Sequence, residues 1–131
     1  MKKFACLLIA CFTLVALTHA QDNKKSWKAM DEFHTVMSQT FHPAEDGDLA
    51  PIKKRSQEMV DKAVAWQNST APEGFDKQKV DESLKKLVKG TKDLQKLVKS
   101  KSTDKVLTEK LSGLHDIFHE IMEKCEKDEH H

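Results

Sequence analysis

The chain has 131 residues, of which 22 are basic, 21 are acidic and only four are glycine. This length suffices for one small domain, and the sequence contains neither a glycine-rich phosphate loop nor an evident serine, histidine and aspartate arrangement, so we do not expect an enzyme. The near-zero net charge gives little reason to expect binding of nucleic acid or of an anionic membrane.

Residues 1–20 have the layout of a secretory signal peptide. Two lysines precede an apolar run, and small residues stand before Gln21, so we expect cleavage after Ala20. Lipidation at Cys11 is the alternative, although the apolar run continues past that cysteine. The run is also too short to indicate a membrane span. The sequence therefore predicts a secreted or periplasmic domain over residues 21–131, without a transmembrane span.

Loss of the signal peptide changes both the charge and the cysteine content. It removes Lys2 and Lys3, which leaves 20 basic and 21 acidic residues and a net charge of −1. It also removes Cys6 and Cys11, so Cys125 is the one cysteine of the mature chain and no intramolecular disulfide is possible. Cys125 then has three interpretations: a small core residue, a metal ligand, or a bridge between two copies in a homodimer.

A first helix is predicted over residues 26–41. Its apolar side chains recur at spacings of three and four residues, as in a bundle helix, and His34 stands in the same row, so we expect His34 to face the core. Pro43 is expected to end this helix at or before His42, because proline disfavours helical backbone in the residue before it.

The loop AEDGD separates this helix from a second one, which is predicted to run to about Asn68. Asp48 is a candidate cap, and Pro51 suits the first turn, where a missing backbone N–H costs nothing. We expect Trp66 to anchor the core.

Two further helices follow at the same apolar spacing. Asp76 is a candidate cap for the third, whose many lysines are expected to face water. Ser102 or Thr103 can cap the fourth, which is predicted to run to about Glu126. Because short loops place successive helices antiparallel, the sequence predicts an all-α, up-down-up-down antiparallel four-helix bundle.

The segment LHDIFHEIMEKC of the fourth helix carries the main functional signal. Residues four apart are neighbours on a helix surface, so His115 and His119 can present two imidazoles to one ion, with Met122 on the same flank. The first helix, an antiparallel neighbour in this topology, offers further ligands. A trial alignment puts His34 near Phe118 and His119.

The same alignment places Met30 near Met122 and Met37 near His115, with His42 about one turn above His115. We therefore predict a site for a transition-metal ion between the first and last helices. Its predicted ligands are four imidazoles, with Glu45 and three methionines as possible additions: His34, His42, His115 and His119, then Glu45, Met30, Met37 and Met122. Four histidines would suit zinc, whereas methionine ligands would favour copper.

This layout resembles the small secreted four-helix-bundle cytochromes, both the periplasmic b-type family and the cytochromes c prime. The resemblance implies an alternative function, non-covalent binding of haem b for electron transfer. It would assign the iron ligands to Met30 in AMDEF and His119 in LHDIFH. No Cys-x-x-Cys-His motif stands near His119, so covalent haem is not expected. The extra histidines are not needed for haem, which favours a metal ion.

The spacing of His115 and His119 also resembles the HExxH motif of metalloproteases. That family uses its glutamate to activate zinc-bound water, and this chain has the shorter Asp116 instead. The difference argues against a protease. A purely structural or interaction module is the remaining alternative.

Overall fold

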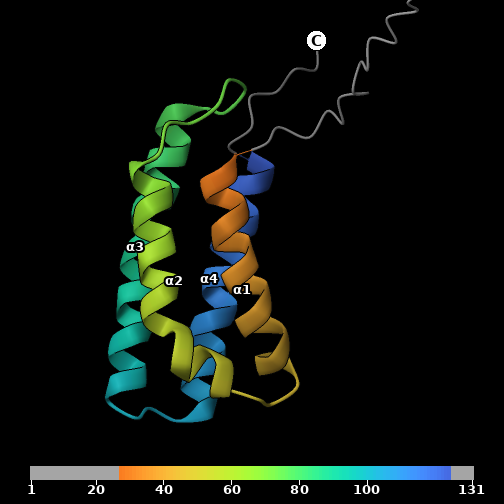
Figure 1. Cartoon of the computed structure of the whole chain (residues 1–131), viewed down its shortest axis with the longest axis vertical. Helices are drawn as coiled ribbons and strands as arrows, with labels where there is room; N and C mark the ends of the chain where they lie inside the picture. Colours follow the sequence, from red (N-terminus) through yellow and green to blue (C-terminus); the bar gives the residue numbers. More distant parts are fainter. Residues whose placement is uncertain (1–26, 125–131) are drawn as a thin grey trace, which may run out of the picture.

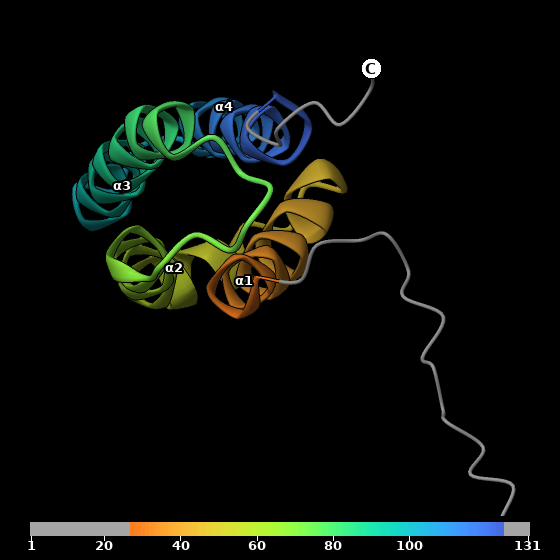
Figure 2. The same cartoon turned by 90° about the horizontal axis from the view of Figure 1, so that it is seen from above.

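The computed structural model describes residues 27–124 and places four α-helices in them. In chain order they are α1 (Lys28–Glu45), α2 (Ala50–Asn68), α3 (Lys77–Lys99) and α4 (Asp104–Lys124). Figure 1 shows successive helices running in opposite directions, and the end view in Figure 2 shows them arranged in a ring. Each helix packs on the next and α1 packs on α4, so the predicted all-α four-helix bundle is confirmed.

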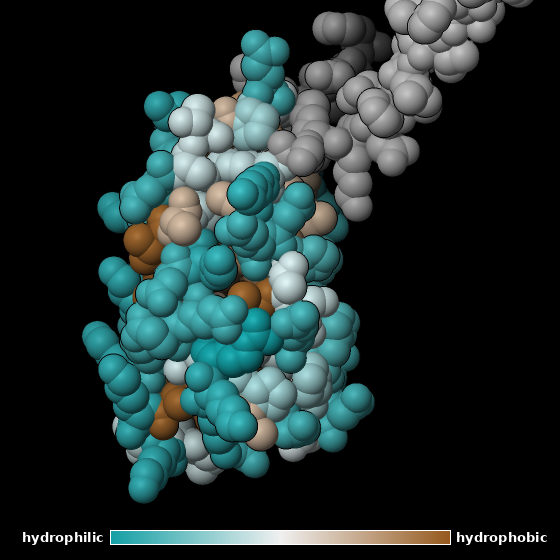
Figure 3. Space-filling model, viewed as in Figure 1, coloured by the Kyte–Doolittle hydropathy of each residue, from teal (hydrophilic) through white to brown (hydrophobic). Residues whose placement is uncertain are grey.

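The predicted signal peptide, the alternative lipidation site and Cys125 lie outside the described residues. Within residues 27–124, none of the helices is both long enough and apolar enough to cross a membrane. The face in Figure 3 is accordingly mostly hydrophilic, with small separate apolar areas.

The buried row of α1 differs from the predicted one. His34 is exposed, whereas Phe33 next to it is fully buried, so the prediction of a core-facing His34 was wrong. Burying the phenylalanine ring removes a large apolar surface from water, while a buried neutral histidine needs hydrogen-bond partners for its ring nitrogens. The buried residues of α1 are Met30, Phe33, Val36, Met37, Thr40, Phe41 and Ala44.

The end of α1 also lies beyond its predicted position. Pro43 stands inside the helix, which continues to Glu45. Proline cannot donate a backbone hydrogen bond, but its own carbonyl still accepts: the backbone N–H groups of Asp46 and Asp48 donate to the Pro43 carbonyl at 3.0 and 2.9 Å. His42 and Glu45 consequently belong to the last helical turn, so their side chains are held by regular backbone.

The other helix ends follow the sequence signals closely, except for the cap of α2. Asp48 does not occupy the predicted cap position: the N-cap of α2 is Leu49, without a side-chain cap, and the Asp48 carboxylate accepts the Ala50 N–H at 3.0 Å from one residue further out. Pro51 lies in the first turn of α2, as predicted. Asp76 accepts the Lys79 N–H at 3.3 Å and caps α3. Of the two candidates for α4, Thr103 accepts the Val106 N–H at 3.3 Å.

Aromatic rings fill the end of the bundle where α1 begins. Trp27 packs edge-on against Trp66 and Phe75, with ring centroids 5.8 and 5.1 Å away, and its indole N–H donates to Ser69 Oγ at 2.8 Å. Trp66 is fully buried, as predicted, and also contacts Phe33. This cluster fixes the N-terminal end of α1 against the loop between α2 and α3.

Glycine permits a close approach of α3 and α4. A Cβ atom at Gly90 would lie 2.4 Å from a methyl carbon of buried Leu114. By contrast, a Cβ at Gly113 would meet no atom within 4 Å, because Gly113 is exposed. The two glycines therefore have different structural roles.

Candidate metal centre

Two imidazoles of α4 lie within contact of each other. The Nε2 atoms of His115 and His119 are 3.2 Å apart, and the ring planes are inclined at 70° with centroids 4.4 Å apart. The i to i+4 spacing on one helix creates this proximity. His119 is exposed and His115 is half-buried, so the pair opens to solvent on one side.

Phe41 of α1 fixes the orientation of His115. The two rings stack with centroids 4.0 Å apart and planes inclined by only 17°. Phe41 is itself buried, so this contact joins the imidazole to the core between α1 and α4. Restricting the ring in advance reduces the ordering cost of binding a ligand.

The surroundings of His115 favour its neutral form. Burial lowers the pKa of His115 below its ordinary value, and repulsion from His119 and His42 lowers it further, against the opposing pull of Asp116 and Glu45. A neutral imidazole is the form that binds a metal ion. His115 is therefore ready to act as a ligand at neutral pH.

Glu123 lies one helical turn beyond His119. Its carboxylate oxygen is 3.9 Å from His119 Nδ1, at the far side of the ring from the Nε2 atom that faces His115. A carboxylate beside Nδ1 favours the tautomer that carries its proton there, and the Nε2 atom then accepts a hydrogen bond from His115 Nε2 at 3.2 Å when no ion is bound. Glu123 thus lies near the outer nitrogen of His119, at a distance too long for a hydrogen bond.

The last turn of α1 carries two further ionisable residues that act on His115. His42 and Glu45 both act electrostatically on His115, one lowering and the other raising its pKa, and both side chains are exposed. These two residues bring an imidazole and a carboxylate to the edge between α1 and α4. Pro43 between them is part of the helix that holds them there.

The distance within the pair matches metal chelation. Two nitrogens 3.2 Å apart, each about 2.0–2.1 Å from one ion, subtend an angle of roughly 103° at that ion, close to the tetrahedral value. The spacing of the two nitrogens is thus compatible with binding of one ion by both rings. Within residues 27–124, however, no group of three or more histidine, cysteine, aspartate or glutamate side chains is arranged to hold a metal ion.

The other predicted ligands lie in different surroundings. The His34 ring stacks on Phe118 at 4.9 Å, which confirms the predicted alignment of α1 with α4 at this level. Met30 and Met37 are buried in the core, and Met122 is partly buried against it. Their thioethers contribute to apolar packing. The ring that covers His115 is that of Phe41, a residue that the sequence pattern assigned only to the core.

The residues proposed for haem ligation differ in exposure. Met30 is buried, whereas the His119 side chain is 48% exposed. The large core side chains Trp66, Phe33 and Phe118 contact one another in the bundle interior. Haem binding through Met30 and His119 stays a prediction.

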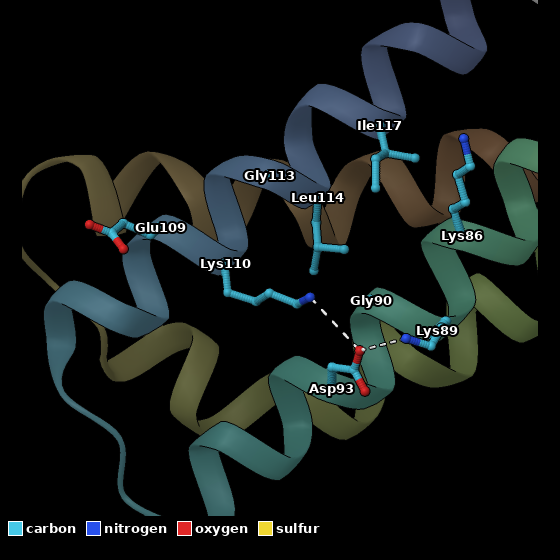
Figure 4. A pocket seen from close by; sticks show the side chains of 9 residues that line it. All are labelled: Lys86, Lys89, Gly90, Asp93, Glu109, Lys110, Gly113, Leu114 and Ile117. Atoms are coloured by element: carbon cyan, nitrogen blue, oxygen red, sulfur yellow. Dashed lines mark ion pairs between the residues drawn. The ribbon is translucent and has the colours of Figure 1, made fainter.

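A separate hollow of about 350 Å³ lies between α3 and α4, away from the histidine pair. Figure 4 shows Asp93 on its wall, paired with Lys89 at 3.6 Å and Lys110 at 3.9 Å. Leu114 and the backbone at Gly90 form part of its inner surface. None of the residues that line it is a histidine or a methionine, so it is distinct from the candidate metal centre.

Sequence reasoning missed the supporting residues Phe41 and Glu123. Glu123 was recognisable, because it stands four residues after His119, whereas the contact of Phe41 with His115 depends on how two helices pack. Comparisons of the chain with protein-family models, with curated proteins and with solved structures gave no match.

Proposed function

We propose that this protein is a secreted or periplasmic binding protein for a transition-metal ion, zinc or copper(II), held at the edge between α1 and α4. The 3.2 Å separation of the His115 and His119 Nε2 atoms carries the proposal, because it equals the spacing of two ligands on one ion. Export is inferred from the signal-like character of residues 1–20.

The donor atoms at this edge determine the class of metal. Imidazole nitrogen and carboxylate oxygen are available there, and such a set suits zinc or copper(II). Soft copper(I) prefers thioether sulfur, but Met30 and Met37 are buried in the core. We therefore rank the nitrogen and oxygen ligands above the methionines.

We infer that His42 or Glu45 completes the coordination from α1. Both side chains are exposed, both act electrostatically on His115, and both stand on the last turn of a neighbouring helix. Small rotamer changes of long or exposed side chains cost little compared with a metal–ligand bond. An ion bound in this way would link α1 to α4, which the chain itself joins only through α2 and α3.

Isothermal titration of the mature chain with zinc and with copper(II) tests the proposal. All variants carry His130→Ala and His131→Ala, so that the two histidines at the C-terminus contribute no ligand. We expect one bound ion per chain. His115→Ala and His119→Ala should each weaken the affinity by at least about tenfold, because either change leaves α4 with a single imidazole.

His34→Ala is the matched control. It removes an imidazole of the same helix edge whose ring lies on Phe118, and the affinity should change by less than about twofold. His42→Ala and Glu45→Gln test the contribution of α1 separately. Metal affinity that is unchanged in both His115→Ala and His119→Ala would rule out the proposed centre. A large loss of affinity in His34→Ala would instead show that the ion binds further towards the start of α1, near His34.

A further inference from the structure

The outer face of α3 carries a straight row of lysines. Spacings of four, three, four and three residues keep the members on one side of the helix, over a length of about 21 Å. The core side chains Leu84, Leu87 and Leu94 lie on the opposite side, and all five lysines are exposed. We call this set the lysine row: Lys85, Lys89, Lys92, Lys96 and Lys99.

The charge of the lysine row is largely uncompensated. Among residues 27–124, only one of its members, Lys89, pairs with a carboxylate, that of Asp93 at 3.6 Å. The whole of α3 has eight lysines against three acidic residues. Five close like charges repel one another. Lys96 and Lys99, in the last turn of α3, also complement the helix dipole, whereas Lys85 and Lys92 have no ion pair within residues 27–124.

The opposite side of the bundle has the opposite charge. α1 itself has three acidic residues against the single Lys28, and one of them, Glu32, pairs with Lys62 of α2 at 3.4 Å. Two more, Asp46 and Asp48, follow in the loop after α1. Figure 2 shows α3 across the ring from α1, so the molecule is electrostatically polarised despite its small net charge. A polyanion is therefore attracted to the α3 face and repelled from the α1 face.

The character of the lysine row narrows the class of partner. No aromatic side chain interrupts α3, so there is no platform for stacking nucleic-acid bases. Of the large apolar side chains in the described part of the chain, only Val106 is exposed, and it belongs to α4, so this face has none to insert into a bilayer. The row offers charge alone, presented along a line.

Linear polyanions differ in the spacing of their charges, which can be compared with the spacing of the lysines. The lysine row presents about one positive charge per helical turn, which is roughly 5 Å. Duplex DNA carries one negative charge per about 1.7 Å of its axis, a much denser array. In an extended polyuronate chain, each sugar ring has one carboxylate and spans a length similar to one helical turn.

From this match we propose that the lysine row is a docking surface for a linear anionic polysaccharide with about one carboxylate per ring. The surface is independent of the histidine pair, because its five residues all belong to α3. It goes beyond the proposed metal binding, and either proposal can fail without the other.

The test uses the mature chain with a chelator present, so that metal binding cannot contribute. An oligogalacturonate long enough to span the row is the probe, and a neutral maltooligosaccharide of equal length is the control ligand. The variant Lys85→Gln/Lys89→Gln/Lys92→Gln/Lys96→Gln/Lys99→Gln should bind at least about tenfold more weakly, with a shallower dependence of affinity on salt.

A matched variant changes five other exposed lysines and should bind within about twofold of the native chain: Lys28→Gln/Lys54→Gln/Lys77→Gln/Lys79→Gln/Lys105→Gln. Circular dichroism confirms that both variants are helical. Absence of binding at low salt, or equal losses in the two variants, would overturn the proposal. So would tighter binding of the native chain to duplex DNA or to phosphatidylglycerol vesicles than to the oligogalacturonate.

Discussion

Gly113→Ala and Gly90→Ala should change the stability of the bundle in opposite directions. Both glycines stand inside long helices, where alanine is favoured over glycine by about 1 kcal/mol. At Gly113 the new methyl group meets no atom within 4 Å, so the full gain is expected. For a domain of this size, it corresponds to a rise in melting temperature of about 4–8 °C.

The same methyl group at Gly90 would lie 2.4 Å from a methyl carbon of Leu114. Leu114 is almost fully buried, and although it borders the hollow between α3 and α4, its side chain has to leave its packed position; such overpacking costs about 1–3 kcal/mol. Set against the same gain in helix propensity, the net effect of Gly90→Ala is a loss of up to about 2 kcal/mol.

Urea denaturation of the two variants and the native chain measures this difference. The propensity term is common to both substitutions and cancels when they are compared, which leaves the cost of the contact with Leu114. Gly90→Ala/Leu114→Ala is the control, because it removes the side chain that must move; the glycine substitution should then be less costly than in the native background. If Gly90→Ala stabilises the chain as much as Gly113→Ala does, the close approach of α3 and α4 is not as described.

Three further predictions concern the metal centre and a helix cap. Zinc affinity should fall on acidification, because protons compete with the ion for the imidazoles. Since the pKa of His115 is lowered, His115 should be lost as a ligand at a lower pH than an ordinary histidine. Titration calorimetry between about pH 8 and pH 5 measures the affinity, and an affinity that stays constant over this range would contradict the prediction. Phe41→Leu should expose the His115 imidazole and thereby raise the pKa of His115 towards its ordinary value. The substitution should also lower the free energy of unfolding by about 1 kcal/mol. An NMR titration of His115 that does not change in this variant would contradict the role of Phe41. Thr103→Ala should destabilise the chain by about 1 kcal/mol, because it removes the cap of α4. Ser102→Ala should change the stability by less than about 0.5 kcal/mol. Equal effects of the two substitutions in thermal melts would refute the assignment of Thr103 as the cap.

The proximity of His115 and His119 was predictable because it depends on one helix only. Any regular helix places side chains four residues apart on the same flank, whatever packs against it. The caps Asp76 and Thr103 were predictable for the same reason, since each bonds a backbone group three residues away. Short loops then determined the antiparallel order of the helices.

Helical periodicity alone left the exact buried face of α1 open. A row through His34 and a row through Phe33 fit the spacing almost equally well, and the choice between them depends on the total apolar surface removed from water. That surface is decided by what the neighbouring helices offer, here Trp66 and Phe118 against Phe33.

The sequence by itself therefore determined the four helices, the caps of α3 and α4, the order of the helices and the histidine pair, because each of these depends on interactions within a few residues. The tertiary structure alone decided that Phe41 stacks on His115, that His34 points outward onto Phe118, and that His42 and Glu45 of α1 act electrostatically on His115. These features depend on the rotation and axial position of one helix against another. Close packing of side chains across the whole core sets both quantities, and no local pattern encodes them.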